Sequence, residues 1–281
     1  MARTLIVYDD GSQLLEKAAD VAGCFASLVK CVPASQAERL DAYRNLVLVC
    51  NAAGASQNLL AVAAQAKEHR TGLLTVGSGA GCREDIEAAL GHPLICSAGL
   101  ETGWLEADGY CDGLLCALHS VLSAVDGPVK TLPREELKAR IDAFVLRHDA
   151  CALACASDGF VRNTALDFRY MDGNFYIVSE GGQKFHAILR DPKVSLLIYD
   201  SPKQGGNVTS VQVAGRAYRV PMWSDEYVQI LEKTWGNVQI RRNSLVRLNV
   251  LKIIPDRMEY FSYTLKPLDV DLKQTYIPDH V

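Results

Sequence analysis

The segment from Asp158 to Asp200 limits the possible folds most strongly, because its side chains alternate in polarity as those of half-buried β-strands do. Within residues 160–170, one face carries Arg162, Thr164, Leu166 and Phe168, and the other carries Val161, Asn163, Ala165 and Asp167. The Asp172-Gly173 pair between two β-rich runs is typical of a two-residue hairpin turn. The segment therefore predicts antiparallel strands rather than helices.

A polar, glycine-rich bend follows the second of these strands. Residues 175–179 form the strand, and the sequence SEGGQK then places Lys184 in the first turn of a short helix. Arg162, Thr164, Ser179 and Lys184 thus supply two cations and two hydroxyl groups near a helix N-terminus, where an anion is stabilised. Each of them alone is an ordinary surface residue. Their combination predicts an anion-binding site.

The order of these motifs resembles that of the pyridoxamine 5′-phosphate oxidase-like, FMN-binding split barrels, which are mainly antiparallel α+β domains. The motifs that carry the resemblance are Arg162-Asn163-Thr164, Phe175 to Ser179, Gln183-Lys184, Arg190-Asp191-Pro192 and Gln212-Val213-Ala214-Gly215-Arg216-Ala217. They cover roughly the second half of the chain, and the ordered series is more specific than any single motif.

The resemblance implies a cofactor and a set of contacts. In such barrels an arginine and a lysine hold the FMN phosphate, and the isoalloxazine ring lies along the strands at a homodimer interface. The cofactor-binding residues implied here are Arg162, Asn163, Thr164, Val178, Ser179, Gln183, Lys184 and Gln212. The amide of Gln212 needs a hydrogen-bond partner, which either the flavin edge or the backbone could supply.

The implied function is that of an FMN-binding protein, used as a flavin-dependent oxidoreductase whose substrate the sequence does not identify. Relatives of this barrel also bind haem or a deazaflavin. Haem would require a histidine at the dimer cleft, for which His186 and His280 are the candidates, whereas a deazaflavin would use the same phosphate cations. A non-catalytic regulatory or electron-transfer protein is a further alternative, since no residue stands out as a general acid or base.

The first 125 residues predict a different kind of domain. The apolar runs lie at residues 4–8, 46–51 and 72–76, and the helical patterns at residues 13–26, 58–69, 83–90 and 112–125. Uninterrupted apolar strands that alternate with helices are typical of a parallel sheet covered on both faces. This half resembles a flavodoxin-like three-layer α/β domain.

The loop in which flavodoxins hold the FMN phosphate is acidic in this sequence, Asp9-Asp10-Gly11-Ser12. Two carboxylates within a few ångströms of a phosphate would repel it. Residues 50–58 offer no aromatic side chain to stack on a flavin, although the loop from Gly77 to Gly81 could form an anion-binding nest. We therefore expect the flavodoxin-like fold without its cofactor.

Residues 126–132 lack a periodic pattern and predict a linker between a domain at 1–125 and the split barrel at 133–281. Within the barrel, Gly215 interrupts a long strand at residues 209–220, which predicts a β-bulge or a close approach of another backbone segment. The last two strands are expected at residues 246–254 and 258–263.

Overall composition excludes several classes of protein. A net charge of −4 and a pI near 5.9 argue against a nucleic-acid partner. No apolar run reaches the roughly 18 to 20 residues that span a bilayer, and the N-terminal run is too short for a signal peptide, so we expect a cytoplasmic protein without a membrane partner. Nine cysteines with no C-x-x-C spacing predict buried reduced thiols rather than disulfides or a metal site.

Overall fold

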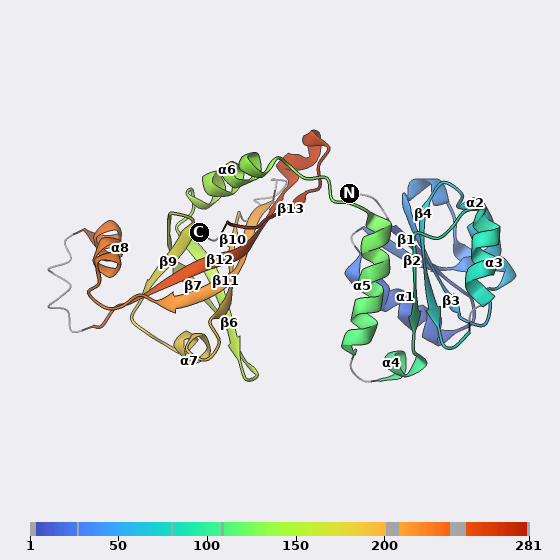
Figure 1. Cartoon of the computed structure of the whole chain (residues 1–281), viewed down its shortest axis with the longest axis horizontal. Helices are drawn as coiled ribbons and strands as arrows, with labels where there is room; N and C mark the ends of the chain where they lie inside the picture. Colours follow the sequence, from blue (N-terminus) through green and yellow to red (C-terminus); the bar gives the residue numbers. More distant parts are fainter. Residues whose placement is uncertain are drawn as a thin grey trace. The chain divides into compact units, whose positions relative to one another are not determined.

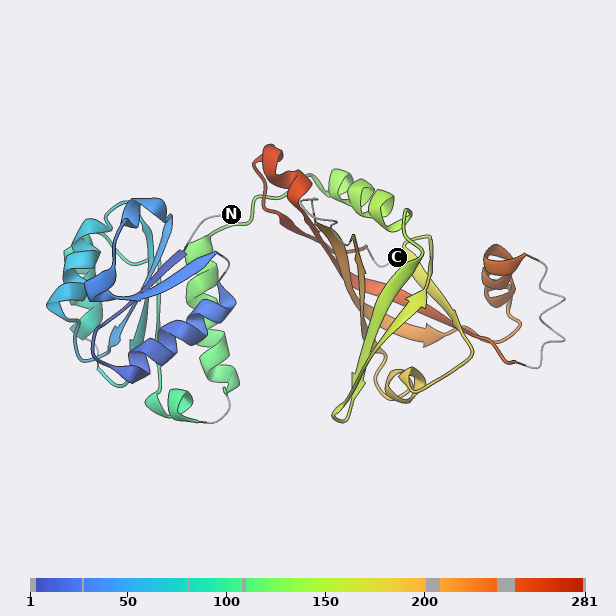
Figure 2. The same cartoon turned by 180° about the vertical axis from the view of Figure 1, so that it is seen from behind.

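The chain divides into two units, Met1–Val129 and Lys130–Val281, in the computed structural model shown from opposite sides in Figures 1 and 2. The structure describes residues 4–26, 28–79, 81–107, 110–200, 208–236 and 246–279. No helix within these ranges is both long enough and apolar enough to cross a lipid bilayer.

The N-terminal unit is built on a five-stranded parallel sheet with the strand order β2-β1-β3-β4-β5. Its strands are β1 (Thr4–Tyr8), β2 (Val29–Pro33), β3 (Asn45–Asn51), β4 (Arg70–Val76) and β5 (Cys96–Leu100). This order is that of flavodoxin-like doubly wound sheets. The predicted flavodoxin-like fold class is confirmed.

Helices cover both faces of this sheet (Figure 1). They are α1 (Gln13–Phe25), α2 (Gln57–Gln65), α3 (Gly81–Leu90), α4 (Thr102–Glu106) and α5 (Asp112–Asp126), with two 3₁₀ turns, η1 (Ala34–Gln36) and η2 (Leu40–Ala42). Helices α1 and α5 bury their apolar faces against alternate strand residues such as Ile6 and Val47. Helices α2 and α3 pack against the intervening residues, such as Leu5 and Leu48. Both faces of each central strand are therefore buried, which explains the uninterrupted apolar runs.

Strand β2 was not expected from the sequence. It is the edge strand next to β1, and only Val32 of its five residues is buried. Because four of its five residues are half-buried or exposed, among them the charged Lys30, the segment shows neither a continuous apolar run nor a clean alternation.

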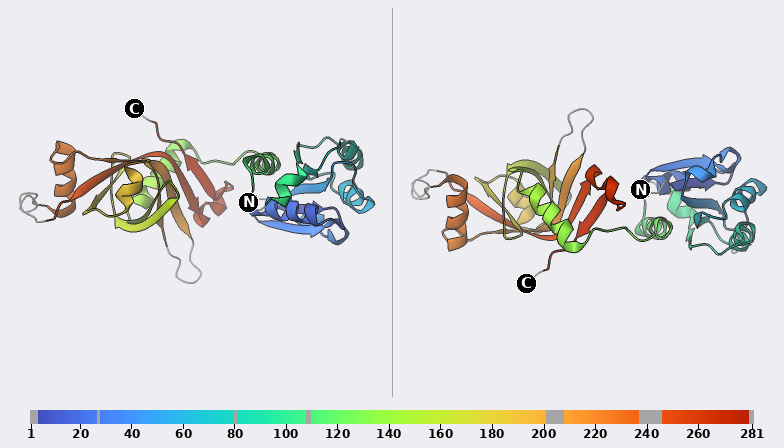
Figure 3. Two further views of the ribbon diagram at one scale, coloured as in Figure 1. Left: turned by 90° about the horizontal axis from the view of Figure 1, so that it is seen from below. Right: turned by 90° about the horizontal axis from the view of Figure 1, so that it is seen from above.

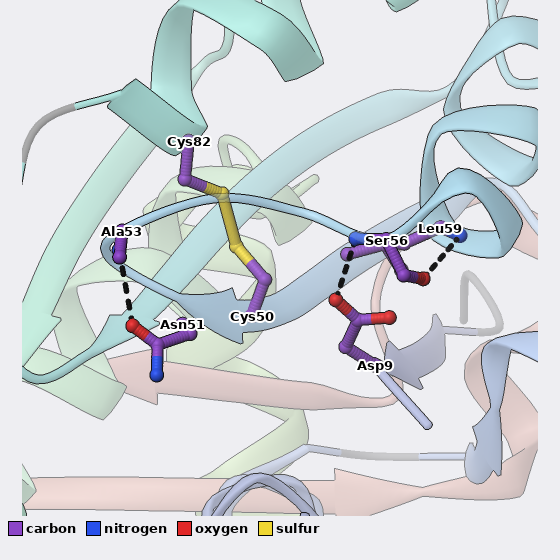
Figure 4. The surroundings of a disulfide bond; sticks show 7 residues. All are labelled: Asp9, Cys50, Asn51, Ala53, Ser56, Leu59 and Cys82. Atoms are coloured by element: carbon purple, nitrogen blue, oxygen red, sulfur yellow. Dashed lines mark hydrogen bonds between the residues drawn. A yellow bond between two sulfur atoms is a disulfide. The ribbon is translucent and has the colours of Figure 1, made fainter. Parts of the chain in front are cut away.

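A disulfide joins Cys50, at the end of β3, to Cys82, in the first turn of α3 (Figure 4). Both residues are buried. The expectation of reduced thiols is therefore wrong for this pair, whereas the other seven cysteines are free. The two cysteines are 32 residues apart. The two chain segments lie close together because β3 and β4 are neighbours in the sheet. The spacing of the cysteines in the sequence does not indicate which strands are neighbours.

We predict that removal of this disulfide destabilises the N-terminal unit. Closing a loop of 32 residues restricts the unfolded chain, so the double variant Cys50→Ser/Cys82→Ser should lose about 3 to 4 kcal/mol of unfolding free energy. Chemical denaturation of the full-length protein measures this loss, and reductant should reproduce it in the unsubstituted protein. The control Cys24→Ser/Cys116→Ser, at two exposed free thiols, should unfold as the unsubstituted protein does; an equal loss in both variants would contradict the prediction.

The C-terminal unit is an antiparallel sheet with the order β7-β6-β10-β11-β12-β9-β8, and β13 pairs with β12. The strands are β6 (Ala150–Ser157), β7 (Phe160–Asp167), β8 (Arg169–Met171), β9 (Asn174–Ser179), β10 (Lys193–Tyr199), β11 (Thr209–Arg219), β12 (Asn249–Ser262) and β13 (Lys273–Tyr276). The sheet curls into a half-barrel, whose curvature is visible in Figure 3. The predicted split-barrel fold class is confirmed.

The bounds of the strands differ from the predicted ones in two places, whereas the predicted bulge at Gly215 is present. Strand β12 runs unbroken through Pro255, where two strands were predicted. A register shift opposite Gly215 accommodates this proline. A Cβ at residue 215 would lie 2.4 Å from the carbonyl oxygen of Ile254, so the predicted bulge and its glycine are confirmed. The expected single strand at residues 160–170 is instead divided between β7 and β8 at Phe168, whose side chain is buried.

Helices α6 (Arg134–Val145), α7 (Lys184–Ile188) and α8 (Asp225–Trp235) and the 3₁₀ helix η3 (Tyr263–Leu268) complete the unit. Helix α6 inserts Leu137, Ile141 and Phe144 into the barrel core. Helix α8 packs on a separate cluster beside β9 and β12. Helix α7 lies against β6 and β7, which sets the position of the bend that precedes it.

Candidate functional site

The anion site predicted from the sequence lies on the inner face of β7 and on the bend before α7. On β7, Arg162 is opposite Cys155 of β6 and Thr164 is opposite Leu153. Both β6 residues belong to the barrel core, so the side chains of Arg162 and Thr164 share the core-facing side of the sheet.

A tight turn and two glycines bring the second part of the site to the first. Asp172 and Gly173 both have positive φ, 49° and 78°, as a primed hairpin turn requires, and this turn directs β9 back along β8. After β9, Gly181 and Gly182 have φ values of 150° and 106°, which favour glycine. The hydroxyl of Ser179 donates to the Gly181 carbonyl and accepts from the Gly181 amide. This closed bend delivers Lys184 toward β7.

Lys184 is only 6% exposed, which is unusual for a lysine. Its ammonium group donates to the carbonyl oxygen of Gly181. Burial lowers the pKa of Lys184 from its ordinary value; Glu180 opposes the shift, and the positive charge of Arg162 adds to it. Arg162 donates through Nη1 to Oε1 of Gln183, at 3.0 Å. Two cations therefore lie within electrostatic range of each other, and the structure shows no ion pair for either of them among its described residues.

The residues present fit a bound anion. The hydroxyl oxygen of Thr164 is buried and has no hydrogen-bond partner in the described part of the chain. A buried hydroxyl without a partner is costly, and so is a buried ammonium group without a counter-charge. A phosphate would compensate both cations, and the Thr164 hydroxyl is a further donor on the same face of β7 as Arg162.

Three of the sequence-predicted residues point elsewhere. Asn163 lies on the outer face of β7, opposite Ala154, and Gln212 lies on the outer face of β11, opposite Leu197 and Glu259. The side chain of Val178 packs into the α8 cluster on the opposite face of β9 from Ser179. The structure thus brings together Arg162, Ser179, Gln183 and Lys184, and it places Thr164 on the same face of β7 as Arg162. The roles of Asn163, Val178 and Gln212 stay predictions.

The two histidines that were named as haem ligands have different positions. His186 is an exposed residue of α7, and its ring lies against Phe160 with a centroid distance of 5.6 Å. His280 lies outside the described residues. Over the ranges that the structure covers, no group of three His, Cys, Asp or Glu side chains is arranged to hold a metal ion.

Sequence reasoning missed one residue of this site, Cys155. Its thiol donates to the main-chain carbonyl of Lys184, at 3.7 Å. In the sequence Cys155 is one of several apolar residues on β6, and nothing distinguishes it from a core thiol. Its position opposite Arg162 could have been found only from the pairing of β6 with β7.

A cavity of about 700 Å³ lies at the other end of β9 from Ser179. Its walls include Lys138, Tyr170, Asn174, Lys252, Met258 and Tyr276. Both lysines are already paired with carboxylates, Lys138 with Asp142 and Lys252 with Glu226. None of the predicted cofactor-binding residues lines this cavity.

In the N-terminal unit, the acidic loop after β1 holds neighbouring loops together. Asp9 is 7% exposed and accepts from the amide of Ser56 at 2.8 Å (Figure 4). Asp10 accepts from the amide and hydroxyl of Ser35 and from Asn58, and these hydrogen bonds lower its pKa. Gly79, after β4, packs against the loop that follows β3, where an added Cβ would lie 2.8 Å from the carbonyl oxygen of Ala52. Ala80, within the predicted nest, lies outside the described residues.

Comparison with known proteins identifies the barrel. Residues 137–262 match the family model of pyridoxamine 5′-phosphate oxidase. The resemblance that the sequence motifs indicated is therefore confirmed. No curated protein matches the sequence.

Three solved structures illustrate the similarity. A FAD-binding protein from Mesorhizobium loti is 23% identical, with 47% of this chain and 93% of that chain aligned and a TM-score of 0.37. The haem storage protein HutZ of Vibrio cholerae is 16% identical over 42% of this chain and 89% of its own, with a TM-score of 0.37. ChuZ of Campylobacter jejuni is 16% identical over 59% of this chain and 66% of its own, with a TM-score of 0.41.

We predict that Lys184 costs the folded protein stability. Where the pH is below the lowered pKa of Lys184, the side chain is charged in both states and burial penalises the folded one. Between that pKa and the ordinary value of 10.5, only the unfolded chain binds the proton, so stability rises with pH. The variant Lys184→Met should therefore unfold with a free energy on the order of 1 kcal/mol higher at pH 7, and the gain should shrink as the pH approaches 10.5.

Thermal unfolding of the full-length protein over this pH range measures the effect. The matched control is Lys193→Met, at an exposed lysine of β10, which should change stability little at any pH. A Lys184→Met variant that is less stable than the unsubstituted protein at pH 7 would contradict the prediction.

Proposed function

Because residues 137–262 form a barrel of the pyridoxamine 5′-phosphate oxidase family, we propose that the C-terminal unit binds FMN and holds its phosphate with Arg162, Ser179 and Lys184. The observation that carries this proposal is the burial of Lys184, which is 6% exposed and has a main-chain carbonyl as its hydrogen-bond acceptor. A site that retains such a cation at a cost in stability is expected to use it for an anionic ligand.

The side chains of the site would each make a different contact with a phosphate. Lys184 contributes a point charge, and Arg162 contributes a planar guanidinium that can bind two oxygens. Gln183 restrains Arg162 through the 3.0 Å hydrogen bond to Nη1. The hydroxyl of Thr164 adds a donor that needs a partner, and the hydroxyl of Ser179 would donate to the phosphate in place of the Gly181 carbonyl. The site therefore matches a phosphate in charge and in hydrogen-bonding capacity.

Bound flavin would supply hydride or electron transfer, and the chain would supply binding and orientation. The anion site contains no side chain placed to act as a general acid or base toward a substrate, so we assign no catalytic residue. We propose an FMN-dependent oxidoreductase of unassigned substrate. A flavin-holding protein without turnover is the second candidate, and the same absence among the residues of the site favours it.

We further propose that the protein is a homodimer whose interface is the outer face of the barrel sheet. This face carries mostly small or apolar side chains along neighbouring strands, Ala152, Ala154, Ala165, Leu197 and Ala214. Asn163 and Gln212 lie on the same face. A flavin ring at this interface would meet their amides, which accounts for both residues in the motif series.

We predict that FMN binding depends on the two cations. The double variant Arg162→Ala/Lys184→Ala removes two charge-assisted contacts to the phosphate, so it should bind FMN at least about 100-fold more weakly. Titration of the purified protein with FMN, followed by flavin fluorescence and absorption, measures the affinity. Riboflavin, which lacks the phosphate, should bind equally to both proteins.

The control for this titration is Arg140→Ala/Lys266→Ala, at a half-buried arginine of α6 that is paired with Glu136 and an exposed lysine of η3, which should bind FMN normally. Unchanged FMN affinity in the Arg162→Ala/Lys184→Ala variant would contradict the assignment. A Soret band in the purified protein, together with no uptake of FMN, would show that the protein binds haem instead of flavin. Release of a deazaflavin from the purified protein would leave the assignment of the phosphate site unchanged and would show that the bound cofactor is a deazaflavin instead of FMN.

We predict that a charge on the outer face separates the subunits. Leu197 is an apolar residue of β10 that is 39% exposed, and burying a glutamate at an apolar interface is costly. Leu197→Glu should therefore shift the molar mass measured by size exclusion with light scattering from two chains to one. The control Leu268→Glu changes a leucine of similar exposure, 44%, in η3. A monomeric unsubstituted protein, or an equal shift in both variants, would contradict the proposed interface.

A further inference from the structure

Cys155 lies directly beneath the two cations of the anion site. It is 4% exposed on the core-facing side of β6, opposite Arg162 in the register with β7. The contacts of α7 with β6 and β7 place the first turn of this helix against the same strands. Cys155 is thus the residue of the barrel floor that touches both the strand of Arg162 and the helix of Lys184.

The contact with the helix is a hydrogen bond from the Cys155 thiol to the carbonyl oxygen of Lys184, at 3.7 Å. Carbonyls of the first turn of a helix ordinarily accept from amides four residues later. Helix α7 has only five residues, Lys184–Ile188, so its own hydrogen bonds hold it weakly. The hydrogen bond from the strand below therefore adds to the packing of Ala187 and Ile188 in the barrel core in fixing the position of Lys184.

The thiol keeps its proton at neutral pH and so remains a donor. Burial raises the pKa of Cys155, and the positive charges of Lys184 and Arg162 oppose this rise without reversing it. A thiolate could not donate to a carbonyl oxygen, whereas the neutral thiol can.

From this geometry we propose that Cys155 is a positioning residue of the phosphate site, which anchors the first turn of α7 and thereby holds the ammonium group of Lys184 against the ligand. The proposal rests on the proposed function for its ligand. It does not require the thiol to touch FMN.

The same strand offers a matched control. Cys151 is also buried, at 6% exposure, on the same face of β6 and in the same core. Cys151→Ala and Cys155→Ala therefore remove the same atoms from comparable surroundings and leave comparable cavities. Only Cys155→Ala removes the hydrogen bond to Lys184.

The experiment is a titration of the full-length variants with FMN and with riboflavin. Cys155→Ala should weaken FMN binding roughly three- to tenfold, as expected for one lost hydrogen bond, and riboflavin binding less than twofold. Cys151→Ala should change neither affinity. In a Lys184→Ala background, Cys155→Ala should have no further effect on FMN, because its influence passes through Lys184.

Three results would overturn the proposal: equal losses of FMN and riboflavin, equal losses in the Cys151→Ala variant, or an undiminished effect in the Lys184→Ala background. If the unsubstituted protein binds no FMN, the proposed function fails by itself. Hydrogen exchange of the amides of Phe185, His186 and Leu189 then tests the anchor. These amides should exchange faster in Cys155→Ala than in Cys151→Ala, and equal rates would refute it.

Discussion

The physical constraint on which the barrel unit depends is a buried ammonium group, that of Lys184, without a carboxylate to pair with it among the described residues. Such a group is expensive in a folded protein. The surrounding structure is arranged to keep it in place: two glycines with positive φ bend the chain, Ser179 closes the bend, and α7 is anchored on β6. Each of these features would be unnecessary if the lysine lay in solvent.

Successive side chains of β7 point in opposite directions, so its two faces carry different kinds of residue. The inner face presents Arg162 and Thr164 to the buried lysine, and the outer face presents Asn163 beside small residues of β6. The inner face therefore offers a cation and a hydroxyl group, and the outer face offers an amide beside small side chains. A single strand can supply both only because successive side chains point in opposite directions. This alternation places Arg162 and Thr164 on one face of β7 and Asn163 on the other.

Sequence patterns predicted most of the structural features that depend on residues close together in the chain. The alternation of residues 160–167, the Asp172-Gly173 turn and the Gly215 bulge each follow from backbone geometry or side-chain burial within a few residues, and all three are present. Features that depend on pairing between distant segments were missed. The Cys50–Cys82 disulfide requires the adjacency of β3 and β4, and the role of Cys155 requires the register of β6 against β7. Strand β2 was missed because an edge strand buries too little to show a pattern.

In the N-terminal unit, hydrogen bonds and a disulfide connect the loops that surround the flavodoxin-like sheet. In a doubly wound sheet, the carboxyl ends of the strands form the usual ligand crevice. Here Asp9 and Asp10 use their carboxylates to hold the segments around Ser35, Ser56 and Asn58, and the disulfide ties the loop after β3 to the start of α3. These hydrogen bonds and the disulfide connect the loops to one another. Carboxylates have different surroundings in the two units: Asp9 and Asp10 of the first accept hydrogen bonds from neighbouring loops, whereas Glu180 of the second acts on Lys184 through its charge, without an ion pair between them among the described residues.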